Sequence, residues 1–228
     1  MKYMGSKARI AKEILPIILK NRKENQWYVE PFVGGCNSIQ YVKGPRIGND
    51  IHEELIAFCK ALQSGWNPPD ISEKEYYTIK ENKANYPKEL LGYVGFQLTY
   101  GAKYFDSYRR DSTGRRNYSK EAKEHVLKQA SRLKDIIFYN KNYLELDIPP
   151  LSLIYCDPPY RNTTKYKSSL DYNKFYSWCR QQKEKGHTIF ISEYTMPEDF
   201  ICIWQKKINS SLTQDTGSKQ GIEKLFTL

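Results

Sequence analysis

Two kinds of hydrophobic spacing alternate along the first 50 residues. Isoleucines at helical spacing predict an amphipathic helix that Ser6 can cap, and they are Ile10, Ile14, Ile17 and Ile18. The stretch WYVEPF (27–32) predicts a short strand that runs into a turn at Gly34-Gly35, and we expect a second helix to begin at that turn. PRIGND (45–50) predicts a second strand, which ends in an acid.

The second half of the chain shows the same alternation. Ser119 is the expected N-cap of a helix whose apolar face contains Ala122, Val126, Ala130 and Leu133. YNKFYSWCRQQKEKG (172–186) predicts another helix, which Gly186 closes. Short apolar runs predict the remaining strands, and these are DIIFYNKNY (135–143), LSLIYC (151–156), HTIFIS (187–192), FICIWQKKI (200–208) and EKLFTL (223–228).

Between residues 58 and 118 the pattern changes. Tyr, Asn and Lys dominate, and the stretch 100–121 looks like a long polar loop between helices. Elsewhere, strands with nearly continuous apolar cores alternate with helices, which is typical of a parallel sheet covered on both faces. The sequence therefore predicts an α/β fold with a doubly wound, mostly parallel sheet, built from residues 1–57 and 119–228 and interrupted by an insertion over residues 58–118.

Length and composition narrow the class of protein. At 228 residues the chain has room for one domain that carries an insertion. Five well-separated cysteines without a C-x-x-C pair, and only three histidines, support neither a disulfide framework nor a zinc or other metal site. The longest apolar run (14–20) is far shorter than a membrane span, and no signal-peptide cleavage site is evident. We expect a soluble, intracellular protein of the cytoplasm.

The net charge of +10 is concentrated in two short segments. Residues 1–23 hold seven Lys and Arg against Glu13, and residues 101–120 hold six against Asp106 and Asp111, so the rest of the chain is balanced. A positive excess confined in this way favours a polyanion as partner, with a merely soluble basic protein as the alternative.

The stretch YCDPPY (155–160) ends an apolar strand with a carboxylate, two prolines and a tyrosine. Prolines have no N–H to donate and fix their φ angles, so their carbonyls are rigidly held acceptors beside an aromatic ring. In a doubly wound sheet, ligands bind at the carboxyl ends of the strands, near the point where strand order reverses. Gly34-Gly35 permits close approach of the backbone to such a ligand, and Asp50 can accept both hydroxyls of a ribose.

The order of these motifs resembles that of the Dam-like alpha group of S-adenosylmethionine-dependent DNA adenine N6-methyltransferases. The resemblance covers essentially the whole chain. It rests on KYMGSK (2–7), VEPFVGGC (29–36), Asp50 in GND, NKNY (140–143) and DPPY (157–160). Cys36 departs from the family pattern, in which a third glycine usually ends the first cofactor motif.

The resemblance implies a Rossmann-like methyltransferase fold with S-adenosylmethionine as the cofactor. The implied cofactor-binding residues are Tyr3, Lys7, Glu30, Phe32, Gly34, Gly35, Asp50, Asn142, Tyr143 and Asp157. The implied catalytic residues are Asp157, Pro158, Pro159 and Tyr160. Asp157 and the carbonyl of Pro158 would accept the two N–H bonds of the target amine, and Tyr160 would stack on the base. The methyl group would pass in a direct in-line displacement without a metal.

Double-stranded DNA is the implied substrate, and its target adenine must be flipped out of the helix to reach such a site. The insertion over residues 58–118 is the implied target-recognition region, where cations alternate with rings suited to phosphate contact and base stacking. The candidate DNA contacts are Lys103, Tyr104, Tyr108, Arg109, Arg110, Arg115, Arg116, Asn117, Tyr118, Glu193 and Tyr194.

Two alternatives remain open on the sequence alone. The first is methylation of cytosine at N4, because the same tetrapeptide geometry can present either exocyclic amine. The second is a catalytically inactive DNA-binding module, with Cys36 as the visible departure in a core motif. The resemblance also allows a separate restriction endonuclease as partner, whereas the recognised DNA sequence and the oligomeric state are not legible from the residues.

Overall fold

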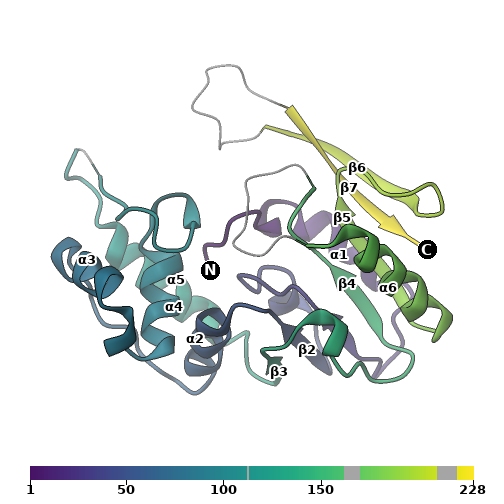
Figure 1. Ribbon diagram of the computed structural model, residues 1–228, viewed down its shortest axis with the longest axis horizontal. Coiled ribbons are helices and arrows are strands. Elements are labelled where there is room, and N and C mark those ends of the chain that lie inside the picture. The colour runs from purple at the N-terminus through teal and green to yellow at the C-terminus, as the bar shows by residue number, and fades with distance from the viewer. Residues whose placement is uncertain (112, 162–169, 210–219) are drawn as a thin grey trace.

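The strands form a single sheet in the structure, a computed structural model that describes residues 1–111, 113–161, 170–209 and 220–228 (Figure 1). Within these residues the sheet has seven strands in the order β3-β2-β1-β4-β5-β7-β6. The parallel strands are β1 (Tyr28–Glu30), β2 (Arg46–Asn49), β3 (Ile136–Tyr139), β4 (Leu153–Cys156) and β5 (Thr188–Glu193). An antiparallel hairpin of β6 (Ile201–Asn209) and β7 (Gln220–Thr227) extends the sheet beyond β5. The predicted doubly wound, mostly parallel sheet is confirmed.

The order of the parallel strands reverses between β1 and β4. These two strands pair directly, with Val29 opposite Ile154, while β2 lies on the far side of β1 and β5 on the far side of β4. Connections that leave a sheet in opposite directions open a crevice at the carboxyl ends of the strands between them. Glu30, the last residue of β1, and Asp157, the first residue after β4, therefore lie at the same edge.

Helices cover both faces of the sheet (Figure 1). The α-helices are α1 (Ala11–Leu19), α2 (Glu53–Gln63), α3 (Glu73–Glu81), α4 (Lys88–Gln97), α5 (Tyr118–Ala130) and α6 (Tyr172–Glu184). The short 3-10 helices are η1 (Lys7–Arg9), η2 (Ile39–Tyr41), η3 (Lys83–Asn85), η4 (Tyr100–Ala102) and η5 (Tyr143–Glu145). None of these described helices has both the length and the apolar character that crossing a bilayer requires.

The strands send alternate side chains into two apolar cores. Tyr28 and Tyr155 belong to the core that α1, α2 and α5 share, whereas Val29 and Ile154 belong to the core beneath α6. All four side chains are at most 1% exposed. Because successive residues of a strand point to opposite faces, the apolar run at β4 contributes to both cores at once.

Three predictions about helix starts are wrong. Ser6 caps the short η1 and not the isoleucine helix: its Oγ atom accepts the N–H of Ala8 at 3.2 Å, whereas α1 follows Ile10, which has no side-chain cap. The glycine turn leads only into the short η2 and not into an α-helix, because Gly34 and Cys36 have φ angles of +47° and +56°, outside the helical region. The cap of α5 is Asn117 rather than Ser119: the Oδ1 atom of Asn117 accepts the backbone N–H of Lys120 at 2.9 Å. Ser119 lies inside the first turn of that helix.

The insertion contains more regular structure than the sequence indicated. It includes α3 and α4, and α4 is buried from Leu91 to Gln97. α4 approaches α2 so closely that a Cβ atom added to Gly92 would lie 2.1 Å from the carbonyl oxygen of Glu54. The boundary drawn after residue 57 falls inside α2, so this helix joins the sheet to the helical part of the molecule at the left of Figure 1.

Candidate active site

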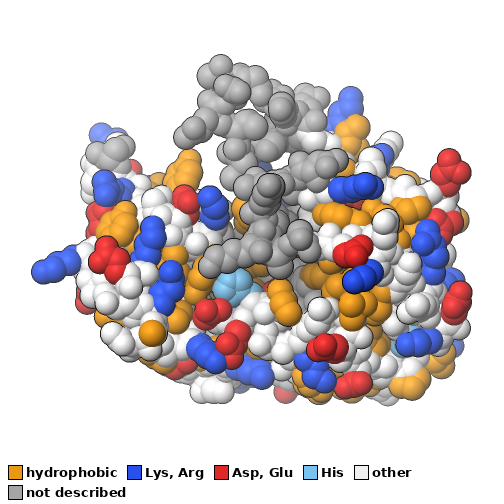
Figure 2. Space-filling view, viewed as in Figure 1, with side chains coloured by type: hydrophobic (Ala, Val, Ile, Leu, Met, Phe, Trp, Pro, Cys, Tyr) orange, Lys and Arg blue, Asp and Glu red, His pale blue; other side chains and the backbone are white. Residues whose placement is uncertain are grey.

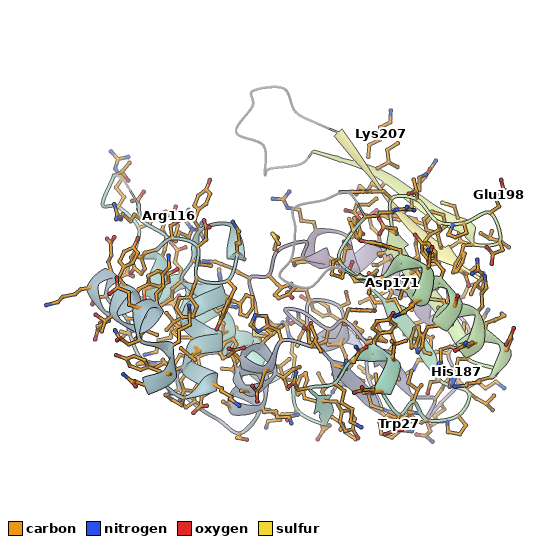
Figure 3. All side chains as sticks on the ribbon, viewed as in Figure 1. Trp27, Arg116, Asp171, His187, Glu198 and Lys207 are labelled. Atoms are coloured by element: carbon orange, nitrogen blue, oxygen red, sulfur yellow. The ribbon has the colours of Figure 1, made fainter. Side chains whose placement is uncertain are left out.

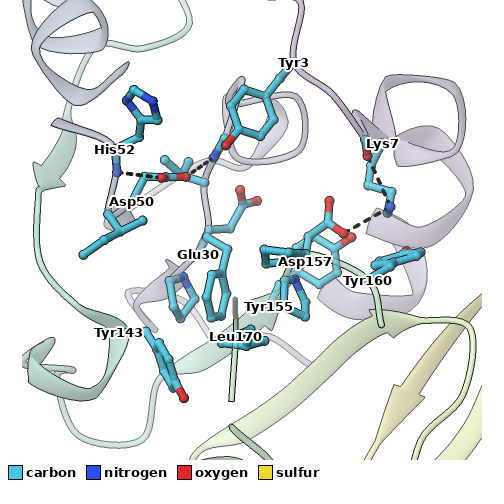
Figure 4. A pocket seen from close by; sticks show the side chains of 18 of the residues that line it. Tyr3, Lys7, Glu30, Asp50, His52, Tyr143, Tyr155, Asp157, Tyr160 and Leu170 are labelled. Atoms are coloured by element: carbon cyan, nitrogen blue, oxygen red, sulfur yellow. Dashed lines mark hydrogen bonds and ion pairs between the residues drawn. The ribbon is translucent and has the colours of Figure 1, made fainter. Parts of the chain in front are cut away.

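A cavity of about 470 Å³ opens at the carboxyl ends of β1, β2 and β4 (Figure 4). Every residue that the sequence suggested for cofactor binding or catalysis lines this cavity, and so does Tyr194. Leu170, Lys174 and Glu223 also line it, and sequence analysis missed all three. The volume is in the range of small-molecule and cofactor pockets. The structure thus brings together motifs that are far apart in the sequence.

Tyr3 shapes the glycine turn after β1. A Cβ atom at Gly34 would lie 2.8 Å from a ring carbon of Tyr3, and one at Gly35 would lie 2.7 Å from Nδ2 of Asn37. The positive φ angle of Gly34 is a further reason for glycine, since L side chains rarely adopt it. The N-terminal segment and the glycine turn therefore form one close-packed wall of the cavity, on which no further side-chain atom fits.

Asp50 is held in place by backbone donors at the end of β2. Its Oδ2 atom accepts the N–H of Gly34 and its Oδ1 atom accepts the N–H of His52, both at 3.0 Å. Asn140 donates its side-chain amide to the carbonyl oxygen of Asp50 at 2.8 Å, which ties the end of β2 to the segment after β3. Burial raises the pKa of Asp50, and these backbone bonds partly oppose that rise. The carboxylate is fixed between the first cofactor motif and the cavity.

Glu30 is a buried acid at the end of β1. Its side chain accepts the hydroxyl of Tyr28 at 2.8 Å, and the residue is only 4% exposed. Burial raises the pKa of Glu30 to about 8, the bond from Tyr28 opposes this, and the nearby charge of Asp157 adds to it. Glu30 therefore carries a proton at neutral pH in this structure, which makes it a hydrogen-bond donor as well as an acceptor toward the cavity.

Lys7 forms the centre of a charged network that includes Asp157. The Nζ atom of Lys7 lies 3.1 Å from Oδ1 of Asp157 (Figure 4). It also lies 3.5 Å from Oε2 of Glu223. The same ammonium lies 4.2 Å from the centroid of the Tyr160 ring, a cation–π contact. Burial disfavours the charged form of Lys7, but the two carboxylates outweigh it and raise its pKa. Burial raises the pKa of Asp157 to about 6, and Lys7 opposes that rise.

Glu223 enters the site from the C-terminal hairpin. It lies on β7 and accepts the hydroxyl of Tyr160 at 2.7 Å. The signal that could have found it is the period of two: Glu223 shares a face of the strand with Leu225, which is fully buried. An acid at an inward position of an apolar strand indicates an internal partner, but the sequence alone did not show that the partner is in DPPY.

Aromatic rings line the remaining walls. Phe32 packs on Tyr143, with ring centroids 5.1 Å apart, next to the segment NKNY. Asn142 caps η5, because its Oδ1 atom accepts the N–H of Leu144 at 3.1 Å. On the other side, the rings of Tyr160 and Tyr194 meet edge to face at 4.6 Å. One part of the cavity is therefore suited to a planar ligand near Phe32, and another to a planar ligand near Tyr160.

Cys36 occupies the position at which the family pattern has a third glycine. Its φ angle of +56° is one that favours glycine, so the backbone here is that of a glycine turn although the residue is cysteine. The side chain is fully buried, and its Sγ atom lies 3.7 Å from Sγ of Cys59 on α2. The sulfur therefore packs into the core behind the turn and does not appear among the cavity lining.

Three candidate DNA contacts are packed against the protein. Tyr104 lies edge-on to His52, with ring centroids 4.5 Å apart, and Tyr108 donates its hydroxyl to the carbonyl oxygen of Ile71 at 3.3 Å. Glu193 is 1% exposed, and burial raises its pKa to about 7. All three side chains therefore pack against other parts of the protein and support its internal structure.

Salt bridges hold several cations of the same segment. Each partner is an acid close to the insertion: Lys103 pairs with Asp106, Arg110 with Glu73, and Arg116 with Glu121. All six side chains are at least 31% exposed. Exposed ion pairs of this kind contribute little to stability. Little free energy would therefore be lost if one of these cations left its acidic partner to bind a phosphate.

A basic and aromatic surface lies at the start of α5. The guanidinium of Arg109 lies 3.9 Å from the ring centroid of Tyr118, and that of Arg116 lies 4.7 Å from the same ring. The side chain of Arg115 is exposed and forms no salt bridge with a described residue, while its backbone N–H donates to Oδ2 of Asp111 at 2.8 Å. Figure 3 places Arg116 on the helical part of the molecule, away from the sheet, and Figure 2 shows Lys and Arg side chains over that part of the surface. This surface has the composition that phosphate contact requires.

The strand order and the cavity at its reversal point are consistent with a Rossmann-like methyltransferase α/β fold. Comparison with protein families is more specific. The model of the D12 class N6 adenine-specific DNA methyltransferases matches residues 3–195, which is most of the chain. The chain belongs to this family, whose reaction is methylation of adenine in DNA. The match includes DPPY and ends before β6, so the hairpin that carries Glu223 lies outside it.

Proposed function

We propose that the protein transfers a methyl group from S-adenosylmethionine to N6 of an adenine that is flipped out of double-stranded DNA at specific sites. One observation carries the proposal: DPPY at the end of β4 lines the same cavity as the glycine turn and Asp50. A nucleoside cofactor and a flipped base would therefore meet at the edge where the strand order reverses.

The residues of the cavity fit S-adenosylmethionine. Gly34 and Gly35 form a wall in which a Cβ atom would clash, Asp50 offers a buried carboxylate for ribose hydroxyls, and Phe32 and Tyr143 offer aromatic surface for an adenine ring. Glu30 and Lys7 supply the polar groups for the amino-acid end. When bound, this cofactor would supply a methyl group made electrophilic by its sulfonium. No metal enters this chemistry.

Asp157 and Pro158 would prepare the target amine. The exocyclic nitrogen of adenine is a poor nucleophile because its lone pair is delocalised into the ring. An amine that donates one N–H to the carboxylate of Asp157 and the other to the carbonyl of Pro158 is pulled toward tetrahedral geometry, which localises the lone pair. The two prolines keep that carbonyl in one position, so the acceptors need no reorganisation when the base arrives.

Lys7 would tune the charge of Asp157 during this step. A carboxylate has two oxygen atoms, and Lys7 binds Oδ1 of Asp157 at 3.1 Å. The ammonium favours the ionised form of the buried carboxyl near neutral pH, and this form is the stronger hydrogen-bond acceptor. Tyr160 and Tyr194 would flank the flipped base, and their existing contact would place one ring face for stacking.

The basic surface at the start of α5 would supply the binding energy for base flipping. Extrusion of a base costs a few kcal/mol, which contacts elsewhere on the DNA must offset. Arg109, Arg115 and Arg116 are exposed or half-buried cations on the insertion, and Tyr118 beneath them can support stacking. Lys103 and Asn117 lie in the same segment and would contribute polar contacts.

The test is transfer of labelled methyl from S-adenosylmethionine to unmethylated DNA, followed by nucleoside digestion and mass analysis. N6-methyladenine in the product is the expected result. N4-methylcytosine would retain the chemistry and overturn the target base, whereas DNA binding without product would favour an inactive module. Asp157→Ala is the matched control, because it removes the acceptor and should abolish transfer while cofactor binding persists.

A further inference from the structure

We propose that Glu223 is a positioning residue of the methyl-transfer site, which holds Lys7 and Tyr160 so that Asp157 stays available to the target amine. This inference rests on the proposed function and extends it to a residue outside every motif. Glu223 lies on β7, beyond the residues that the family model matches. The role follows from contacts and not from the motif pattern.

One oxygen of Glu223 serves two donors from different segments. Its Oε2 atom accepts the hydroxyl of Tyr160 at 2.7 Å and lies 3.5 Å from Nζ of Lys7. The residue is only 6% exposed, and its strand is anchored by Leu225, which is fully buried on the same face. A buried carboxylate is costly unless charged or hydrogen-bonded partners offset its desolvation. Lys7 and Tyr160 are those partners, so the three groups fix one another.

Glu223 limits the competition between Lys7 and the amine. Lys7 has three N–H bonds, and its Nζ atom lies 3.1 Å from Asp157, 3.5 Å from Glu223 and 3.3 Å from the carbonyl oxygen of Gly5. Without the charge at Glu223, Asp157 would be the only carboxylate among the described residues that forms an ion pair with the ammonium. Lys7 would then bind more tightly to the acceptor that the amine needs. A second carboxylate divides that attraction.

Glu223 also fixes the ring of Tyr160. The hydrogen bond at 2.7 Å anchors the hydroxyl, while Tyr194 meets the ring at 4.6 Å and Lys7 lies 4.2 Å from its centroid. A ring that is already held loses little conformational entropy when a base stacks on it, whereas a mobile ring loses more and so weakens binding. Glu223 therefore prepares the stacking surface before the base arrives.

The charged and titratable groups around Glu223 come from several elements of the fold. They are Lys7 on η1, Tyr155 on β4, Asp157 and Tyr160 after β4, Glu193 on β5, Tyr194 after it, and Lys206 on β6, which lies opposite Glu223 and pairs with Glu13. Burial is the main cause of the raised pKa of Asp157, and the charge of Glu223 adds to it. Replacing Glu223 with glutamine keeps the shape and removes the charge, so the pKa of Asp157 should fall.

The experiment compares the wild-type chain with Glu223→Gln, Glu223→Asp and a surface control, Glu184→Gln, which removes an exposed acid at the end of α6. Initial rates with labelled S-adenosylmethionine and unmethylated DNA give kcat and both KM values from about pH 5 to about pH 8. Thermal unfolding of each variant gives the fraction of folded protein.

We expect Glu223→Gln to lower kcat on the order of tenfold to a hundredfold, the cost of a misplaced reacting group. KM for S-adenosylmethionine should stay within about twofold, because Glu223 contacts Lys7 and Tyr160 rather than the ribose site. The acid limb of kcat/KM should move to lower pH, since Asp157 loses a neighbouring negative charge. Glu223→Asp should restore part of kcat and the position of that limb, and Glu184→Gln should behave as wild type.

A folded Glu223→Gln variant with unchanged kcat and an unchanged acid limb would overturn the role, as would a loss explained entirely by unfolded protein. If Glu223→Gln does not fold, Tyr160→Phe removes the other half of the hydrogen bond, and wild-type kcat in that variant would overturn it. A wild-type chain that transfers no methyl group fails the proposed function itself, and the role of Glu223 falls with it.

Discussion

Lowering the pH should slow methyl transfer, because Asp157 becomes protonated. The ionised carboxylate is the strong acceptor for an N–H of the amine, whereas protonation turns one oxygen of the group into a donor and weakens the other as an acceptor. The pKa of Asp157 is raised to about 6, mainly by burial. With that pKa, the ionised fraction falls from about nine-tenths at pH 7 to about one-tenth at pH 5. A carboxyl with the ordinary pKa would still be more than about nine-tenths ionised at pH 5. We therefore expect kcat/KM to fall about tenfold over this range.

The assay is the initial rate of labelled methyl transfer at constant ionic strength, because DNA binding depends steeply on salt. DNA affinity is measured at each pH in parallel, so that loss of binding is separated from loss of catalysis. Lys7→Gln sharpens the test: Lys7 lowers the pKa of Asp157, so its removal should move the acid limb to higher pH. A rate that stays constant from pH 7 to pH 5, with DNA binding intact, would refute the acceptor role of an ionised Asp157.

Three further predictions concern DNA affinity and the stability of the fold. Arg115→Ala should weaken DNA binding. The slope of the logarithm of the binding constant against the logarithm of the salt concentration should become shallower by about one unit, the value for one lost phosphate contact, and an unchanged slope would exclude that contact. Gly92→Ala should lower the free energy of unfolding, measured in a denaturant titration, by about 1–3 kcal/mol, because the new Cβ would lie 2.1 Å from the carbonyl oxygen of Glu54. Wild-type stability would contradict the close packing of α2 and α4. Cys36→Gly should change the free energy of unfolding by less than about 1 kcal/mol. Glycine relieves the strain of the positive φ angle, and this gain offsets the loss of the buried thiol. A larger loss of stability would show that the contact with Cys59 dominates.

Much of the sheet could be predicted, because short runs of apolar residues in the sequence are enough to locate its strands. Every strand predicted from a short apolar run is present, and the helix over 172–186 ends near Gly186, whose φ angle of +86° closes it. The helix expected after Gly34 is absent because the residues that follow adopt turn conformations, which hydrophobic spacing does not encode. The cap of α5 was misplaced by two residues, since Asn117 and Ser119 are both good N-caps and only the backbone decides between them.

The site could be predicted where the residue types of a sequence motif indicate a chemical role by themselves. DPPY, the glycine turn and Asp50 each suggest a function locally, and the structure brings them to one cavity. Glu223 has no such signal, because a single glutamate in a strand has meaning only through the residues that it meets in space. The packing of Tyr104 was missed for the same reason: an aromatic residue between cations looks like a stacking platform until its neighbours are known.

The N-terminal segment links the insertion to the cavity. The backbone N–H of Lys2 donates to Oε1 of Gln97 at 2.7 Å, and Nε2 of Gln97 donates to the carbonyl oxygen of Lys2 at 3.0 Å. Next to this pair, the ring of Tyr3 packs on Phe96 of the same helix, α4, with centroids 5.4 Å apart. The segment that carries the Tyr3 wall of the cavity, and Lys7 after it, is thus positioned by α4. Any change that displaces α4 from α2 should disturb the cavity as well as the insertion, although α4 contributes no residue to the cavity lining.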